Sequence, residues 1–129
     1  SDFVFCLGHK SNTIIDFFLK ENKKNIKVFK KEKLHTKFEY KHKKTKFLGN
    51  LIYTGLHTGT GGRIKMAYNK LNLNEDIMMT YGDGLSNVSI KKLLQFHYDN
   101  KSKHILLLNS PINIFNSSFY EYLLDVFGV

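Results

Sequence analysis

One pattern recurs along this chain: a short apolar run stops at a turn rich in glycine or threonine, and a segment with helical spacing follows. Residues 3–7 stop at Gly8, residues 76–80 stop shortly before Gly82, and residues 50–54 lead into another glycine-rich turn. Short continuous apolar runs are typical of buried strands, and strands that alternate with helices imply crossover connections. We therefore expect an α/β fold with a largely parallel sheet.

The other segments give weaker signals. Residues 11–13, Ser-Asn-Thr, offer helix N-cap candidates before an apolar helical face that extends to about Asn22. Lysines interrupt the strand-like segments 26–29 and 36–40. The remaining expected elements are helices over 63–68, from Ser89 to about His97 and over 119–127, and a strand over 104–108.

Composition limits the class of protein. With 42% hydrophobic residues over 129 positions, the chain can bury the core of one domain. Its apolar runs are too short to cross a bilayer, so no membrane partner is expected. The lone cysteine, Cys6, cannot form an internal disulfide, which indicates a reducing cytoplasm. A strand-like run begins directly after Ser1, so we expect that the chain lacks its beginning.

The formal net charge of +9 comes from one segment, because residues 20–46 hold twelve lysines and three glutamates while the other residues sum to zero. Only Arg63 is an arginine, and bidentate recognition of guanine or phosphate favours arginine. Phe29, Phe38 and Tyr40 interleave with the lysines, as a stacking surface for single strands requires. We favour a solvated surface over a nucleic-acid partner; the alternative is a basic module that binds RNA or acidic surfaces through residues 20–46.

Two segments combine residues that could support chemistry. Gly82-Asp83-Gly84 places a carboxylate between two glycines at a strand end, which suits Mg²⁺ ligation; an ordinary turn is the alternative. Residues 54–63 carry four glycines and three threonines ahead of Arg63. Their N–H and hydroxyl groups could hold an anion at a helix N-terminus; a flexible hairpin tip is the alternative.

The six histidines predict no further site. None is closely paired with cysteine or carboxylates in the sequence, so a zinc site is not expected. His97 lies among apolar neighbours at helical spacing and is expected to be a packing residue with its hydrogen bonds satisfied. No Ser-His-Asp or Cys-His arrangement can be identified.

Three segments in register resemble the glucose-1-phosphate cytidylyltransferases, a family of sugar-1-phosphate nucleotidyltransferases. They are residues 1–10, residues 58–63, and residues 80–84 with Phe96-His97 downstream, and the resemblance extends from residue 2 to about residue 105. It implies a Rossmann-like, mostly parallel sheet flanked by helices. It also implies a Mg²⁺-dependent reaction of CTP with α-D-glucose 1-phosphate to CDP-glucose and diphosphate, a step towards O-antigen and other surface polysaccharides.

The resemblance also assigns residues. Asp83 would be the catalytic carboxylate and Mg²⁺ ligand, and Gly82 would let the backbone meet the nucleotide. The substrate-binding positions by the same resemblance are Thr58, Gly61, Gly62, Arg63 and Gly82.

Several family features do not occur in these 129 residues. They are the Gly-Gly-x-Gly-Thr-Arg triphosphate loop with its activating lysine, a second metal-binding aspartate, and a Glu-Lys-Pro motif. From about Leu107 onwards the sequence no longer matches the Pro-rich, Arg-Phe-Gly stretch that the family has at this place. We therefore expect a nucleotidyltransferase core fragment over 1–106, a divergent tail over 107–129, and little activity of the chain alone. A homo-oligomer is compatible with the complete enzyme.

Overall fold

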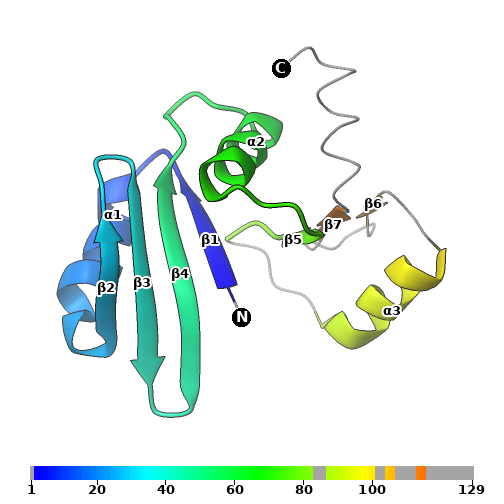
Figure 1. Ribbon diagram of the computed structural model, residues 1–129, viewed down its shortest axis with the longest axis horizontal. Coiled ribbons are helices and arrows are strands. Elements are labelled where there is room, and N and C mark those ends of the chain that lie inside the picture. Colours follow the sequence, from blue (N-terminus) through cyan, green and yellow to red (C-terminus); the bar gives the residue numbers. More distant parts are fainter. Residues whose placement is uncertain (1, 83–86, 101–103, 107–112, 116–129) are drawn as a thin grey trace. The chain divides into compact units, whose positions relative to one another are not determined.

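The computed structural model describes residues 2–82, 87–100, 104–106 and 113–115. The chain divides into two compact units, Ser1–Asn72 and Leu73–Val129. The first unit holds a four-stranded sheet in the order β1-β4-β3-β2 (Figure 1). Its elements in chain order are β1 (Asp2–Leu7), α1 (Ser11–Asp16), the π-helical turn η1 (Phe17–Glu21), the 3₁₀ turn η2 (Lys23–Asn25), β2 (Ile26–Lys31), β3 (His35–His42), β4 (Thr45–Tyr53) and α2 (Thr60–Leu71).

The expected α/β class is confirmed, but the expectation of a mostly parallel sheet is wrong. Only β1 and β4 pair in parallel, whereas β4 with β3 and β3 with β2 are antiparallel. The reason lies in the connections. Residues 32–34 and residues 43–44 join neighbouring strands, and links this short form hairpins because a parallel crossover needs a dozen residues or more. Lys43 adopts the left-handed conformation, with φ 53°, that such a tight turn uses.

The first helix confirms its predicted extent but not its predicted cap. Helical structure continues through α1 and η1 to Glu21. It begins at Ser11 itself, after Lys10 in the left-handed conformation, and no side chain caps it. The backbone N–H of Ser11 donates to the Gly8 carbonyl at 3.2 Å, and that of Thr13 donates to Lys10 at 3.0 Å. The predicted N-cap residues 11–13 therefore lie within the first turn.

Aromatic packing joins this helical segment to one face of the sheet. Phe18 lies between Phe5 and Phe38, with ring centroids 5.1 Å and 5.0 Å away. Phe38 is fully buried and sits opposite Gly49 in the β3–β4 register. A methyl group at Gly49 would overlap the Phe38 ring, so this glycine makes room for the aromatic core. The buried cluster is Leu7, Phe18, Phe38 and Leu51.

In its described residues, the second unit contains a small antiparallel sheet in the order β5-β7-β6 and one helix. The predicted strand over 76–80 is confirmed as β5 (Ile77–Met79), and the helix after Ser89 as α3 (Ile90–Asn100). Strand β6 (His104–Leu106) confirms the start of the 104–108 strand, and β7 (Asn113–Phe115) was not predicted. The predicted helix over 119–127 lies outside the described residues. Within the described parts of the chain, no helix is long and apolar enough to cross a membrane.

Candidate functional site

The parallel pair β1 and β4 brings two strand ends together at the start of the glycine-rich loop. Leu7 and Tyr53 are the last register partners of the pair, and Thr54 follows directly. The Leu7 carbonyl accepts hydrogen bonds from the Thr54 backbone N–H at 2.8 Å and from the Thr54 hydroxyl at 2.9 Å. Thr54 is fully buried. The backbone N–H of Thr54 thus extends the strand pairing by one residue, and its hydroxyl adds a second bond to the same carbonyl.

Arg63 bonds to the same strand ends. Its Nη1 donates to the Thr54 hydroxyl at 2.6 Å and to the Leu7 carbonyl at 3.2 Å, and its Nη2 donates to the Leu56 carbonyl at 3.3 Å. The guanidinium lies against Gly8, where a Cβ atom would come within 2.5 Å of both Nη atoms. Gly8 therefore provides the space that lets Arg63 reach both strands.

Thr58 forms a hydrogen bond across the loop that follows β4. Its hydroxyl donates to the Thr54 carbonyl at 2.5 Å. Gly55 has a φ of 95°, which favours glycine, and a Cβ there would lie 2.7 Å from the Thr58 hydroxyl oxygen. A Cβ at Gly62 would lie 2.9 Å from the Thr58 methyl carbon. Both glycines are needed for the loop to fold tightly around Thr58.

Helix α2 begins three residues earlier than predicted, at Thr60, so the glycine-rich stretch forms its first turn. The N-cap residue, Gly59, makes no side-chain capping bond. Cβ atoms at Gly59 or Gly61 would have no neighbour within 4 Å, so packing requires neither glycine. The free N–H groups of a helix's first turn and its positive dipole end favour an anion. Glycines that packing does not require leave room for one to approach.

The predicted site residues therefore fall into two groups. Thr58, Gly61, Gly62 and Arg63 come together at the start of α2. Gly82 belongs to the second unit and lies exposed in a turn after β5. Asp83 lies outside the described residues, so its assignment stays a prediction.

Sequence reasoning counted Thr54 only among the threonines of the 54–63 segment, and it overlooked Gly8 as part of this site. Thr54 forms hydrogen bonds with Leu7, Thr58 and Arg63. Gly8 leaves the space that the Arg63 guanidinium occupies. A sequence signal existed for both, because each follows an apolar strand directly. Both residues shape the loop: Thr54 through its buried hydroxyl, and Gly8 through the space it leaves for Arg63.

The described histidines, cysteine and carboxylates form no candidate metal centre. In the described ranges, no three residues among His, Cys, Asp and Glu cluster closely enough to hold a metal ion. His97 is buried, as predicted for a packing residue, and its Nε2 lies 3.4 Å from an Asp76 carboxylate oxygen. Its Nδ1 has no hydrogen-bond partner among the described residues, so the expectation that its hydrogen bonds are satisfied is not met there. Burial raises the pKa of the Cys6 thiol, although the nearby Arg63 lowers it in part.

Comparison with known proteins identifies three curated proteins that are similar to this chain. No family model matches the chain. It is 28% identical over 113 residues to proteins named glucose-1-phosphate cytidylyltransferase from Salmonella typhimurium and Salmonella typhi, covering 85% of this chain and 43% of each relative. A Bacillus subtilis protein named "Probable glucose-1-phosphate cytidylyltransferase" is 30% identical, covering 75% of this chain and 37% of the relative.

The chain thus spans less than half the length of these curated relatives. The glycine-rich loop, the start of α2 and the strand before Asp83 all lie within the residues whose resemblance the sequence predicted. The resemblance of this chain to the glucose-1-phosphate cytidylyltransferases, and with it to the enzymes of the sugar-1-phosphate nucleotidyltransferase class, is confirmed.

Proposed function

We propose that this chain is part of a nucleotidyltransferase that joins CTP and glucose 1-phosphate into CDP-glucose and diphosphate. The observation that carries the proposal is the glycine-rich segment that leads into and forms the first turn of α2, in a chain whose curated relatives are named for this activity. We also propose that the complete protein has a Rossmann-like fold, in which the parallel pair β1 and β4 forms part of a larger sheet. Ligands in such folds gather beyond the carboxyl ends of the strands, where Thr54 and Thr58 lie.

In this proposal the start of α2 receives part of the nucleotide. The backbone N–H groups around Gly61 and Gly62 would donate to its anionic groups, and the absence of side chains there permits close approach. Arg63 holds the loop against both strand ends through three hydrogen bonds. The loop would thus be ordered before substrate binds, which lowers the entropy lost on binding.

Asp83 and Gly82 enter the proposal through the resemblance. Asp83 would hold Mg²⁺, with Gly82 letting the backbone approach the nucleotide. Such an ion, when bound, neutralises charge on the phosphates during in-line attack by the sugar phosphate on the α-phosphorus. The protein's own part is then to position both substrates. Because these 129 residues correspond to under half of each relative, we propose that they turn over CTP little or not at all alone.

Nucleotide binding by the purified chain tests the proposal without requiring turnover. We expect calorimetry to detect CTP binding that is strengthened by Mg²⁺ and is tighter than binding of UTP, GTP, ATP or dTTP. Asp83→Asn should remove the strengthening by Mg²⁺ and leave binding in its absence unchanged.

Gly61→Val tests the loop itself. A Cβ atom there meets no neighbour within 4 Å, so we expect the fold to persist while the phosphate approach is obstructed, and CTP affinity should fall at least about tenfold. Met66→Val, exposed on the same helix, is the matched control and should bind CTP normally. Equal CTP affinity of the wild type and Gly61→Val, with both folded by circular dichroism, would contradict the proposed site.

A further inference from the structure

The strand register gathers much of the basic segment on one side of the sheet. Directly opposite residues of neighbouring strands project to the same face, and so do alternate residues of one strand. The β2–β3–β4 register therefore places five lysines on the face opposite the one that carries Phe38. We call it the lysine face; its residues are Lys27, Lys30, Lys37, Lys41 and Lys46.

Positive charge on this face exceeds what the protein neutralises. Lys30 stands directly opposite Lys37, and Lys41 directly opposite Lys46, and like charges in such positions are destabilising. Glu39 lies among them, with Lys46 Nζ 2.9 Å from its carboxylate. The neighbouring lysines, Lys46 first, hold the pKa of Glu39 below its usual value. Lys30 Nζ also lies 2.8 Å from a Glu32 carboxylate oxygen, and Asp2 shares the face because it stands opposite Leu48. Five lysines against these three carboxylates still leave an excess of cations that a bound anion would stabilise.

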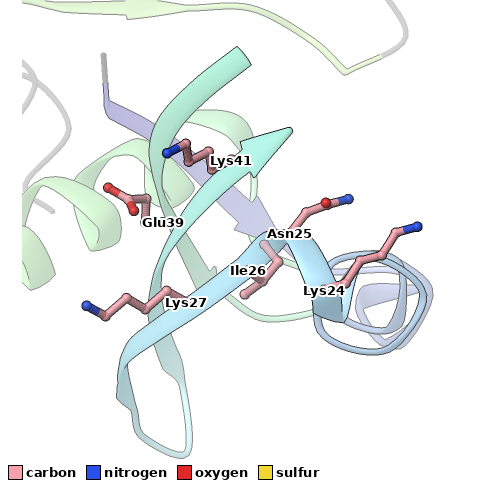
Figure 2. A pocket seen from close by; sticks show the side chains of 6 residues that line it. All are labelled: Lys24, Asn25, Ile26, Lys27, Glu39 and Lys41. Carbon is pink, nitrogen blue, oxygen red and sulfur yellow. The ribbon is translucent and has the colours of Figure 1, made fainter. Parts of the chain in front are cut away.

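The same face has a hollow and an exposed aromatic ring. A depression of about 240 Å³ is lined by Lys24, Asn25, Ile26, Lys27, Glu39 and Lys41. Figure 2 shows Lys27, Glu39 and Lys41 projecting from the same side of β2 and β3. The register slips between Val28 and Lys30, and in this bulge Phe29 is 51% exposed. Lys27 Nζ lies 5.5 Å from the centre of the Phe29 ring, so the ring belongs to the lysine face.

We propose that the lysine face binds single-stranded nucleic acid, with phosphates on the lysines and a base stacked on Phe29. Positive side chains that follow a backbone, beside an aromatic ring, are the combination that binds single strands without sequence preference. Lysines supply charge without the bidentate geometry that reads bases, so we expect no sequence preference. The exposed ring favours nucleic acid over an acidic polypeptide, which offers carboxylates but no bases. The inference is independent of the proposed transferase function.

Salt dependence of binding provides the test. The probe is a fluorescein-labelled oligouridine, with anisotropy measured over roughly 50 to 200 mM salt. If five lysines each neutralise one phosphate, the slope of log K against log salt should be about −3.5, from about −0.7 per contact. Lys27→Ala with Lys41→Ala should reduce the steepness by about 1.4. Phe29→Ala should weaken binding about tenfold and leave the slope unchanged.

The matched control is Lys91→Ala with Lys92→Ala, which removes the same charge from exposed positions on α3. It should leave both affinity and slope unchanged. If the two double variants weaken binding equally, net charge rather than the lysine face attracts the probe, and the proposal fails. It also fails if poly-glutamate of equal charge displaces the oligouridine as well as unlabelled oligouridine does, because the partner would then be an acidic polypeptide. Absence of binding at low salt overturns it outright.

Discussion

Replacing Arg63 by alanine is the sharpest single test of how the strand ends are held. The change removes three hydrogen bonds at once: to the Thr54 hydroxyl at 2.6 Å, to the Leu7 carbonyl at 3.2 Å and to the Leu56 carbonyl at 3.3 Å. These bonds fasten α2 to β1 and to the loop after β4. No other described side chain reaches all three of these acceptors.

The three bonds differ in what their loss leaves behind. The bond to Thr54 is short and its acceptor is fully buried, so by the range for charged donors it is worth about 2 kcal/mol. The Leu7 carbonyl keeps two donors from Thr54, and the bond to Leu56 is long and exposed, so each of these contributes about 0.5 kcal/mol. The expected loss in the free energy of unfolding is about 3 kcal/mol.

Urea denaturation followed by circular dichroism measures this loss. With a slope of about 1.5 kcal/mol per molar urea, the midpoint should fall by about 2 M. Arg63→Lys keeps the charge but offers a single point donor, so its midpoint should fall by an intermediate amount. A loss below about 0.5 kcal/mol for Arg63→Ala would refute the reasoning, because surface substitutions commonly fall in that range.

Two further predictions concern packing and pH. Gly49→Ala should destabilise the protein by about 1–3 kcal/mol, since the new methyl group overlaps the buried Phe38 ring. At Gly59 the methyl group meets open space and only the N-cap preference is lost, so Gly59→Ala should lower the urea midpoint less. Equal midpoints for the two variants would contradict this account. Because burial raises the folded-state pKa of Cys6 above its ordinary value of 9.0, the resulting stabilisation is present below pH 9 and is lost as the pH rises above it. Cys6→Ala should flatten that alkaline decline, and alkylation of Cys6 by iodoacetamide should be slow in the folded protein until the decline begins; rapid alkylation at neutral pH would contradict the burial argument.

The sequence predicted most elements of the fold but not how the strands pair. Strands can be predicted from apolar runs such as residues 3–7 and 76–80, because a strand that is buried on both faces needs a continuous run of hydrophobic residues. In the lysine-rich segments one side of each strand faces away from the core, so lysines alternate with apolar residues and no continuous apolar run marks the strand. Their direction of pairing depends on two tight turns, and the lysines at 43–44 carry little turn signal. A crossover was therefore expected where the chain forms hairpins.

For the candidate site, the sequence located the loop but not its internal bonds. Four glycines near Arg63 indicated an anion site, yet the helix begins at Thr60 rather than after the glycines. The bonds from Arg63 to Thr54 and Leu7 span 9 and 56 positions along the chain, and local spacing cannot reveal contacts that the parallel strand pairing creates. The role of Asp83 stays a prediction from the resemblance.

The two edges of the four-stranded sheet differ in a way that limits self-association. Strand β2 carries Lys27, Lys30 and Lys31 and an irregular register, features that discourage a further strand from adding. Strand β1, at the other edge, exposes Phe3 by 50% and Val4 by 36% and has no lysine. A sheet with one receptive edge can join a second copy, but the pair then presents two unreceptive edges and cannot grow. For the 129-residue chain on its own, edge-to-edge association through this sheet should therefore end at a dimer rather than extend into a fibre.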